Sequence, residues 1–285
     1  MNLEEKIGQL LIVGFNGATV TDHSPIIEDI RQRNLGGVIL FDRFVAEKRA
    51  DNNILCHGQV RELTASLQQR ATTPLLIAVD QEGGMVNRFK AARGFQETMA
   101  AADLGASPTT EATSAAAEQT AVLLAELGIN FNLAPVVDLD TFPDNPIIGR
   151  YRRSFSPHPE QVTAHAAAWV AAHRRHGVDL LDVFRARQHQ EVSACAALWI
   201  SPGIGRQKNW LPVAAILSGM ANTIMSGHLY NRNIDLNYPA TLSSKTITGL
   251  LRRELSCRGR GALRRYADEG DNGLLRAGRG SLSSP

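Results

Sequence analysis

The chain has 285 residues, of which 44% are hydrophobic and 20% charged, and its formal net charge is +2. These proportions fit a globular protein with a large core, and the length favours one α/β domain, because barrels of parallel strands commonly use about 250 residues. The mild basicity is concentrated after Leu250, where the arginines have only Tyr266 as an aromatic partner, so nucleic acid is not an expected partner.

Cysteine spacing and the start of the chain set further expectations. Cys56, Cys195 and Cys257 are far apart, which predicts neither a disulfide framework nor a metal cluster. Residues 1–17 are acidic at first and hold only a short apolar run, which predicts neither a signal peptide nor a membrane span. We therefore expect a cytoplasmic protein with no membrane partner and no metal, nucleotide or other cofactor, since a phosphate loop is also missing.

Short apolar runs in the first half of the chain predict buried parallel strands. Each run is rich in Val, Ile or Leu and is bounded by Gly, Pro or Asp. The four runs are residues 10–15, 38–41, 75–80 and 130–138.

Segments with helical spacing alternate with these runs. Residues 60–69 place their apolar side chains on one face, and residues 111–127 predict an alanine-rich helix that ends before a glycine. Ser156 is the expected N-cap of a further helix, with Pro157 as its first residue and Gly177 after its end. The order of strand and helix predicts a parallel sheet.

Such a sheet is either open and doubly wound or closed into a barrel. The barrel is favoured because residues 14–17 lack the third glycine of a dinucleotide-binding turn. Charged residues such as Asp42, Asp80 and Asp138 also follow the predicted strands, at the edge where barrel enzymes place their active sites. The expected fold is a (β/α)8 barrel of the TIM type.

Residues 80–84 (Asp-Gln-Glu-Gly-Gly) are the first candidate site, and Arg88 follows eight residues after Asp80. The two glycines allow a tight turn beside a ligand, and a carboxylate with a guanidinium can accept and donate hydrogen bonds to sugar hydroxyls. A plain strand-end turn with a surface aspartate is an equal alternative. Arg153, in the loop before a predicted helix, is a weaker candidate, because arginines there usually meet solvent.

Several motifs occur in one order along the chain. They are residues 79–84 (Val-Asp-Gln-Glu-Gly-Gly), 130–138 (Asn-Phe-Asn-Leu-Ala-Pro-Val-Val-Asp), 153–155 (Arg-Ser-Phe), 225–229 (Met-Ser-Gly-His-Leu) and 238–243 (Tyr-Pro-Ala-Thr-Leu-Ser). In this order they resemble glycoside hydrolase family 3, in its bacterial β-N-acetylhexosaminidase branch. The resemblance covers about residues 1–177 and 212–259.

The resemblance implies a (β/α)8 barrel that releases terminal β-linked N-acetylglucosamine with retention of configuration. The typical substrates of this family branch are small carbohydrates, the muropeptides of peptidoglycan recycling. By the same resemblance, Asp80, Arg88, Arg153 and His228 would hold the sugar. A family 3 β-glucosidase and a non-catalytic sugar-binding remnant are the alternative functions.

The segments expected to carry catalysis depart from the family's pattern. Its Lys-His-Phe-Pro-Gly-His-Gly segment and the Asp-Ser-His loop of its general acid/base should lie within residues 178–211, and neither is present. Its aspartate nucleophile, in Ser-Asp-Asp-Met, should follow Gly259 closely. The chain has Arg264 and Arg265 there, with Asp268 as the nearest carboxylate. Retaining hydrolysis needs both groups, so the catalytic residues are unassigned and the chain is expected to be inactive.

The genetic code suggests why the pattern breaks. When the possible codons of residues 263–268 are read one base later, they permit Ser-Asp-Asp-Met-Gln-Met, the family's nucleophile motif. The same shift permits Gly-His-Gly-Ser at residues 185–189 and His-Phe-Gly-Phe at residues 196–200, which are weaker matches. Frameshifts near residues 178–184 and at residues 258–259 would explain all three stretches, and a divergent protein with new loops is the alternative.

One domain and a tail follow from this interpretation. Residues 1–259 form the barrel domain, with an aberrant stretch at residues 178–211, and residues 260–285 form an aberrant, disordered tail. The barrel is then incomplete at its C-terminal end.

The frameshift hypothesis makes a prediction about the coding DNA. Its codons for residues 263–268, read one base later, should spell Ser-Asp-Asp-Met-Gln-Met. Sequencing the gene checks this, and any other reading of those bases rules the hypothesis out.

Overall fold

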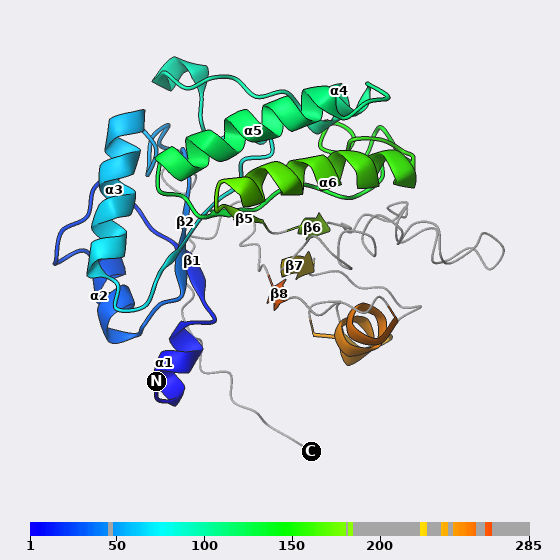
Figure 1. Cartoon of the computed structure of the whole chain (residues 1–285). Helices are drawn as coiled ribbons and strands as arrows, with labels where there is room; N and C mark the ends of the chain where they lie inside the picture. Colours follow the sequence, from blue (N-terminus) through cyan, green and yellow to red (C-terminus); the bar gives the residue numbers. More distant parts are fainter. Residues whose placement is uncertain are drawn as a thin grey trace.

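A computed structural model describes residues 1–44, 48–180, 182–184, 223–226, 235–238, 242–254 and 260–263. Within these residues, helices and strands alternate as the sequence predicts (Figure 1). None of the described helices has both the length and the apolar character needed to cross a membrane.

The elements follow one another from the N-terminus in the order that Figure 1 labels. They are α1 (Leu3–Gly8), β1 (Ile12–Gly14), α2 (Pro25–Gln32), β2 (Gly37–Leu40), α3 (His57–Arg70), β3 (Leu76–Val79), η1 (Ala91–Arg93), α4 (Ala101–Gly105), α5 (Glu111–Glu126), β4 (Phe131–Asn132), α6 (Pro159–Arg175), β5 (Asp179–Leu180), β6 (Asp182–Phe184), β7 (Thr223–Ser226), η3 (Lys245–Glu254) and β8 (Arg260–Leu263).

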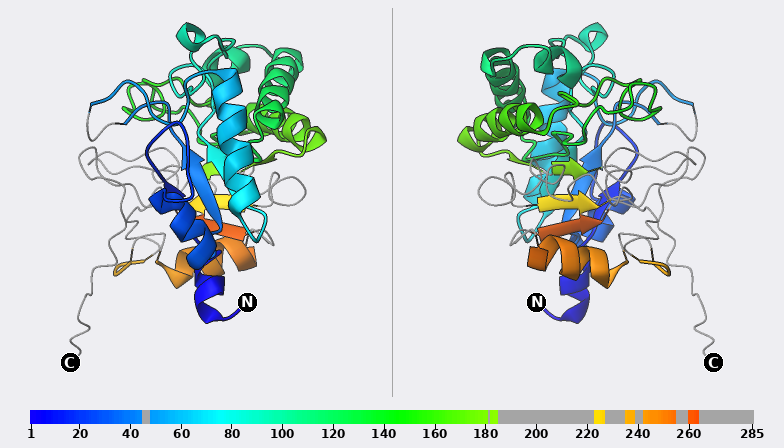
Figure 2. Two further views of the ribbon diagram at one scale, coloured as in Figure 1. Left: turned by 90° about the vertical axis from the view of Figure 1, so that its left-hand side faces the viewer. Right: turned by 90° about the vertical axis from the view of Figure 1, so that its right-hand side faces the viewer.

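All the strand pairs in the described part of the chain are parallel. One sheet has the order β1-β2-β3-β4-β5 and the other has the order β6-β7-β8. β5, the last strand of the first sheet, ends at Leu180, and β6, the first strand of the second sheet, begins at Asp182. The chain therefore passes directly from one sheet into the other. Figure 2 shows β7 and β8 side by side, with η3 next to them. This sequential order of parallel strands is the course of a (β/α) barrel.

Side chains alternate across the strands, as parallel β-structure requires. Val38 and Leu40 of β2, with Ile77 of β3, pack in the same cluster as apolar residues of α2 and α3. Ile39 and Ala78, which point to the other side, form a separate cluster with Phe131 and others. The sheet therefore has apolar packing on both faces, which agrees with the buried strands that the sequence predicts.

The first predicted strand differs from this expectation. It was expected to be buried over residues 10–15, yet Leu10 is 81% exposed, Leu11 41% and Ile12 38%. In the described part of the chain, β1 pairs only with β2, and no strand lies against the other edge of β1. The apolar side chains at this edge therefore remain in contact with solvent.

The fourth predicted strand is also shorter than residues 130–138. β4 consists of Phe131–Asn132, and the ladder continues only to the N–H of Leu133, which donates to the carbonyl of Val79 at 2.8 Å. Pro135 has no N–H to donate, so the ladder cannot continue through it. The residues after Pro135 are nevertheless buried, and their apolar character misled the strand prediction.

The predicted helices are confirmed in α3 and α5, and α6 needs a correction at its start. The helix begins at Pro159 and its N-cap is His158, two residues later than predicted. The reason is that the Ser156 hydroxyl organises a turn before the helix. It accepts the N–H of His158 at 3.1 Å and donates to the Oε1 of Gln161 at 2.5 Å.

The predicted tail begins with ordered structure. Arg260–Leu263 form β8 and pair in parallel with Thr223–Ser226, so the first four residues of the expected tail are a strand. Pairing of this kind uses the backbone, so it does not need the family's side chains. Most of residues 178–211 and all of residues 264–285 lie outside the described residues, so the aberrant stretch and the disorder of the remaining tail stay predictions.

Candidate functional site

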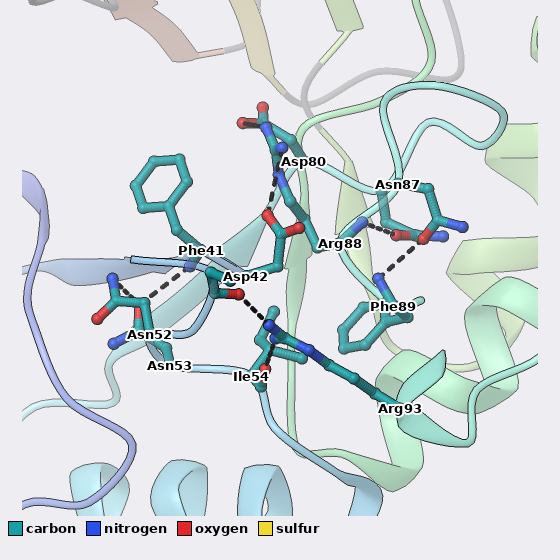
Figure 3. A network of polar contacts seen from close by, with 12 residues as sticks. Phe41, Asp42, Asn52, Asn53, Ile54, Asp80, Asn87, Arg88, Phe89 and Arg93 are labelled. Atoms are coloured by element: carbon teal, nitrogen blue, oxygen red, sulfur yellow. Dashed lines mark hydrogen bonds and ion pairs between the residues drawn. The ribbon is translucent and has the colours of Figure 1, made fainter. Parts of the chain in front are cut away.

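Polar side chains lie where β2, β3 and β4 end, at the edge of the sheet that barrel enzymes use for catalysis. Asp42 follows β2, Asp80 follows β3 and Asn132 ends β4. Their exposed fractions are 7%, 2% and 0%, so all three are buried. Buried polar groups need partners, and these partners define the site (Figure 3).

Asp80 and Arg88 form an ion pair. The Nη2 of Arg88 donates to the Oδ2 of Asp80 at 3.1 Å, and the side chain of Arg88 is 18% exposed. The structure therefore brings these two candidate residues together at the end of a strand, whereas their role in holding a sugar stays a prediction. The guanidinium carbon of Arg88 also lies 5.7 Å from the centre of the Phe41 ring.

The turn that the two glycines form places Arg88 beside Asp80. Gly83 and Gly84 have backbone φ values of 97° and 55°, which residues other than glycine rarely adopt. The turn is closed by the N–H of Val86, which donates to the carbonyl of Gly83 at 3.1 Å. The Oε1 of Gln81 accepts the backbone N–H of Arg88 at 3.0 Å, and this contact brings Arg88 back to the end of β3.

Asn132 fixes the other side of the same turn. Its Oδ1 accepts the N–H of Gln81 at 3.1 Å, and its Nδ2 donates to the carbonyl of Gln81 at 3.1 Å. The same Nδ2 donates to the Nε2 of His173 at 3.2 Å, while the Nδ1 of His173 donates to the carbonyl of Trp169 at 3.0 Å. Asn132 therefore ties β3 to β4 and to α6.

His173 has to be neutral in this arrangement. Burial lowers its pKa from 6.5 to about 4, and the hydrogen bond to the Trp169 carbonyl offsets part of this effect. Since the Nε2 accepts a hydrogen from Asn132, protonation of that nitrogen would turn an acceptor into a second donor facing the amide.

Arg153 pairs with Glu82 rather than standing alone. Its Nε and Nη2 donate to the two carboxylate oxygens of Glu82, each at 2.6 Å, and the side chains are 3% and 5% exposed. The Nη1 of Arg153 donates to the carbonyl of Ile147 at 3.3 Å. This bidentate pair joins the turn after β3 to the loop before α6, and a contact of Arg153 with a sugar stays a prediction.

Sequence reasoning missed several residues of this site. Glu82 and Asn132 lie within the quoted motifs, yet no role was predicted for either residue. Asp42 was noticed only as a charge after a strand, and His173 carried no signal of its own in the predicted helix. Four predicted residues, His228, Arg264, Arg265 and Asp268, lie outside the described part of the chain.

The site is rich in ion pairs and poor in metal ligands. Among the described residues, no group of three or more His, Cys, Asp or Glu side chains could hold a metal ion. The carboxylates of Asp80 and Glu82 face guanidinium groups instead. The arrangement suits hydrogen bonding to a neutral polyol, where carboxylates accept and arginines donate.

Comparison with known proteins agrees with this geometry. The family model "Glycosyl hydrolase family 3 N terminal domain" matches residues 2–260. The chain is 30% identical over 276 residues to a beta-hexosaminidase of Stenotrophomonas maltophilia, covering 88% of this chain and 72% of that protein. It is 32% identical over 272 residues to beta-hexosaminidase A of Pseudoalteromonas piscicida, covering 85% of this chain and 43% of that protein.

A solved structure has the same fold. The glycoside hydrolase family 3 beta-N-acetylglucosaminidase from Paenibacillus superimposes with a TM-score of 0.77 at 29% sequence identity. The match covers 93% of this chain and 49% of that one, so the chain spans about half the length of this relative.

The buried pair of Glu82 and Arg153 leads to a stability prediction. Arg153→Met should lower the free energy of unfolding by about 3–5 kcal/mol, because it leaves the Glu82 carboxylate buried without its cation. Arg152→Met is the matched control. Arg152 is 56% exposed and pairs with Asp103 at the surface, so its loss should cost less than about 1 kcal/mol. Urea denaturation measures both, and equal losses would contradict the structural role of Arg153.

The low pKa of His173 leads to a prediction about pH. The unfolded chain binds a proton at His173 below about pH 6.5, whereas the folded chain binds it only near pH 4. The free energy of unfolding should therefore fall as the pH drops through this window, by about 3 kcal/mol in total from this residue. His173→Gln should remove most of that slope, although burial also lowers the pKa of His165.

Proposed function

Because the chain belongs to glycosyl hydrolase family 3, we propose that it is built to bind and hydrolyse a terminal β-linked N-acetylglucosamine. Relatives that align with 85% or more of the chain are beta-hexosaminidases, and a structure that superimposes on it is a beta-N-acetylglucosaminidase. The observation that carries the proposal is the ion pair of Asp80 and Arg88 at the carboxyl end of a parallel strand.

The pair suits a sugar because Arg88 keeps hydrogen-bonding capacity and is partly open to solvent. Among the described residues, the Nε of Arg88 has no hydrogen-bond partner. Arg88 is also 18% exposed, whereas Arg153 is 3% exposed. Arg88 is therefore the arginine better placed to meet a ligand that arrives from solvent.

The second part of the proposal is that this chain, as its sequence stands, does not catalyse hydrolysis. A retaining mechanism needs a nucleophile on one face of the anomeric carbon and a proton donor toward the leaving oxygen. Neither family motif that supplies these groups occurs in the sequence. Asp268 is the carboxylate nearest to the expected position, but it follows Arg264, Arg265 and Tyr266 and is a poor substitute.

Sugar binding without catalysis is the second candidate function. It is favoured by one contrast: the Asp80, Glu82, Arg88 and Arg153 contacts are intact, whereas the catalytic motifs are missing. For the complete activity, muropeptides of peptidoglycan recycling in the cytoplasm are the proposed natural substrates. This choice is supported only by the resemblance of the motifs.

The activity prediction compares two proteins. The chain as printed should release no measurable chromophore from a chromogenic N-acetyl-β-glucosaminide. A version that reads residues 178–211 and those after 259 in the restored frames should release it. Acid–base catalysis alone contributes about 10²–10⁴-fold, and the covalent route is lost as well, so the difference should exceed this range. Assays with the matching β-glucoside separate a hexosaminidase from a β-glucosidase.

The controls separate the outcomes of this comparison. Asp80→Asn in the restored protein should weaken catalysis by impairing sugar binding, and calorimetry with N-acetylglucosamine should show the same loss in the printed chain. Turnover by the printed chain that Asp268→Ala abolishes would show that the tail supplies a nucleophile. Inactivity of the restored protein on both substrates, with a normal melting curve, would contradict the proposed activity.

A further inference from the structure

Asp42 is a buried carboxylate that lies outside every motif of the family resemblance. It follows β2, is 7% exposed, and its Oδ1 has no hydrogen-bond partner among the described residues. A buried charge without partners is costly, so its retention calls for a compensating cation. Among the described residues, Arg88 forms an ion pair with Asp42, and its Nη1 lies 3.6 Å from the Oδ1 of Asp42 (Figure 3).

The backbone holds Asp42 in this place. Asn53 accepts the N–H of Phe41 at 3.0 Å through its Oδ1, and its own N–H donates to the carbonyl of Phe41 at 3.0 Å. The Nδ2 of Asn53 in turn donates to the carbonyls of Phe15 and Gly17 at 3.1 and 2.8 Å. Phe41 is thus anchored through Asn53 to the segment after β1, and Asp42 is the next residue along the chain.

Arg88 therefore lies between two carboxylates. Its Nη2 is hydrogen-bonded to Asp80 at 3.1 Å, whereas the 3.6 Å separation from Asp42 is an ion pair without a hydrogen bond. With both carboxylates ionised, the trio carries one net negative charge. The neighbouring Glu82 and Arg153 neutralise each other at 2.6 Å and do not offset it.

We propose that Asp42 positions Arg88 against Asp80 and, through its charge, makes the site select neutral sugars over sugars that carry a carboxylate. The inference rests on the proposed function, because it concerns the same sugar site. A neutral sugar can use Asp80 as acceptor and Arg88 as donor at no electrostatic cost. An anionic sugar that approaches Arg88 meets the excess negative charge that Asp42 provides.

The test uses the full chain and three variants. Asp42→Asn and Asp42→Ala remove the charge, and Asp51→Asn is the matched control, because Asp51 lies in the same connection but its side chain is 62% exposed. The first measurement is the NMR resonance of the Arg88 Nε–H group, assigned with Arg88→Lys. The second is the dissociation constant of N-acetylglucosamine and of its C6 carboxylate counterpart, by calorimetry.

We expect the Arg88 resonance to shift in both Asp42 variants and to stay in place in Asp51→Asn. The ratio of the dissociation constants, carboxylate sugar over neutral sugar, should fall about tenfold in both Asp42 variants, as expected for removing one nearby charge from a partly hydrated site. The control should keep the ratio of the unsubstituted chain.

The outcomes separate this inference from the proposed function. An unmoved Arg88 resonance, or an unchanged ratio while the neutral sugar still binds, overturns the role of Asp42. Two Asp42 variants that both fail to fold, by their melting curves, also overturn it, because Asp42 is then structural. If the unsubstituted chain binds neither sugar, the proposed function fails and selectivity fails with it, and the NMR arm alone decides whether Asp42 positions Arg88.

Discussion

The side-chain amide of Asn132 is the contact on which the site depends. A turn as short as residues 80–84 cannot fix its own position, since its glycines allow many backbone conformations. Asn132 removes that freedom by bonding to both the N–H and the carbonyl of Gln81. The position of Asn132 depends in turn on its hydrogen bond to a neutral His173. A helix on the outside of the sheet thereby controls the residues at its edge.

Charge is then distributed unequally along this edge. Glu82 and Arg153 form a buried, bidentate and neutral pair that joins two loops, so their contribution in the structure is mechanical. Asp80 and Arg88 also form an ion pair, but Arg88 retains access to solvent. The same two residue types therefore serve two purposes, and burial is what separates them. A carboxylate whose arginine is fully enclosed supports the turn, whereas one whose arginine is exposed can meet a ligand.

Sequence reasoning captured the parts of the structure that depend on local pattern. Residue spacing predicts β2, β3 and the apolar face of α3. A single glycine, Gly128, predicts where α5 ends. It failed where the outcome depends on distant partners. Ser156 lost its predicted capping role because its hydroxyl serves His158 and Gln161, and Leu10 became exposed because the described residues place nothing over it. Arg153 could be named from its motif, but its partner Glu82, 71 residues away in sequence, could not.

The two interrupted stretches show how differently fold and chemistry depend on sequence. β8 lies after Gly259, where the family's motif is lost, and it still pairs with β7 over four residues. A parallel ladder uses N–H and carbonyl groups, which every residue except proline supplies, so a changed reading frame can preserve a strand if it avoids proline and keeps a suitable length. Glycoside hydrolysis has no such tolerance, because its nucleophile and proton donor must be specific side chains. A frame change in these stretches would therefore remove catalysis while leaving strand pairing, and the ion pairs and hydrogen bonds among residues 80–153, in place.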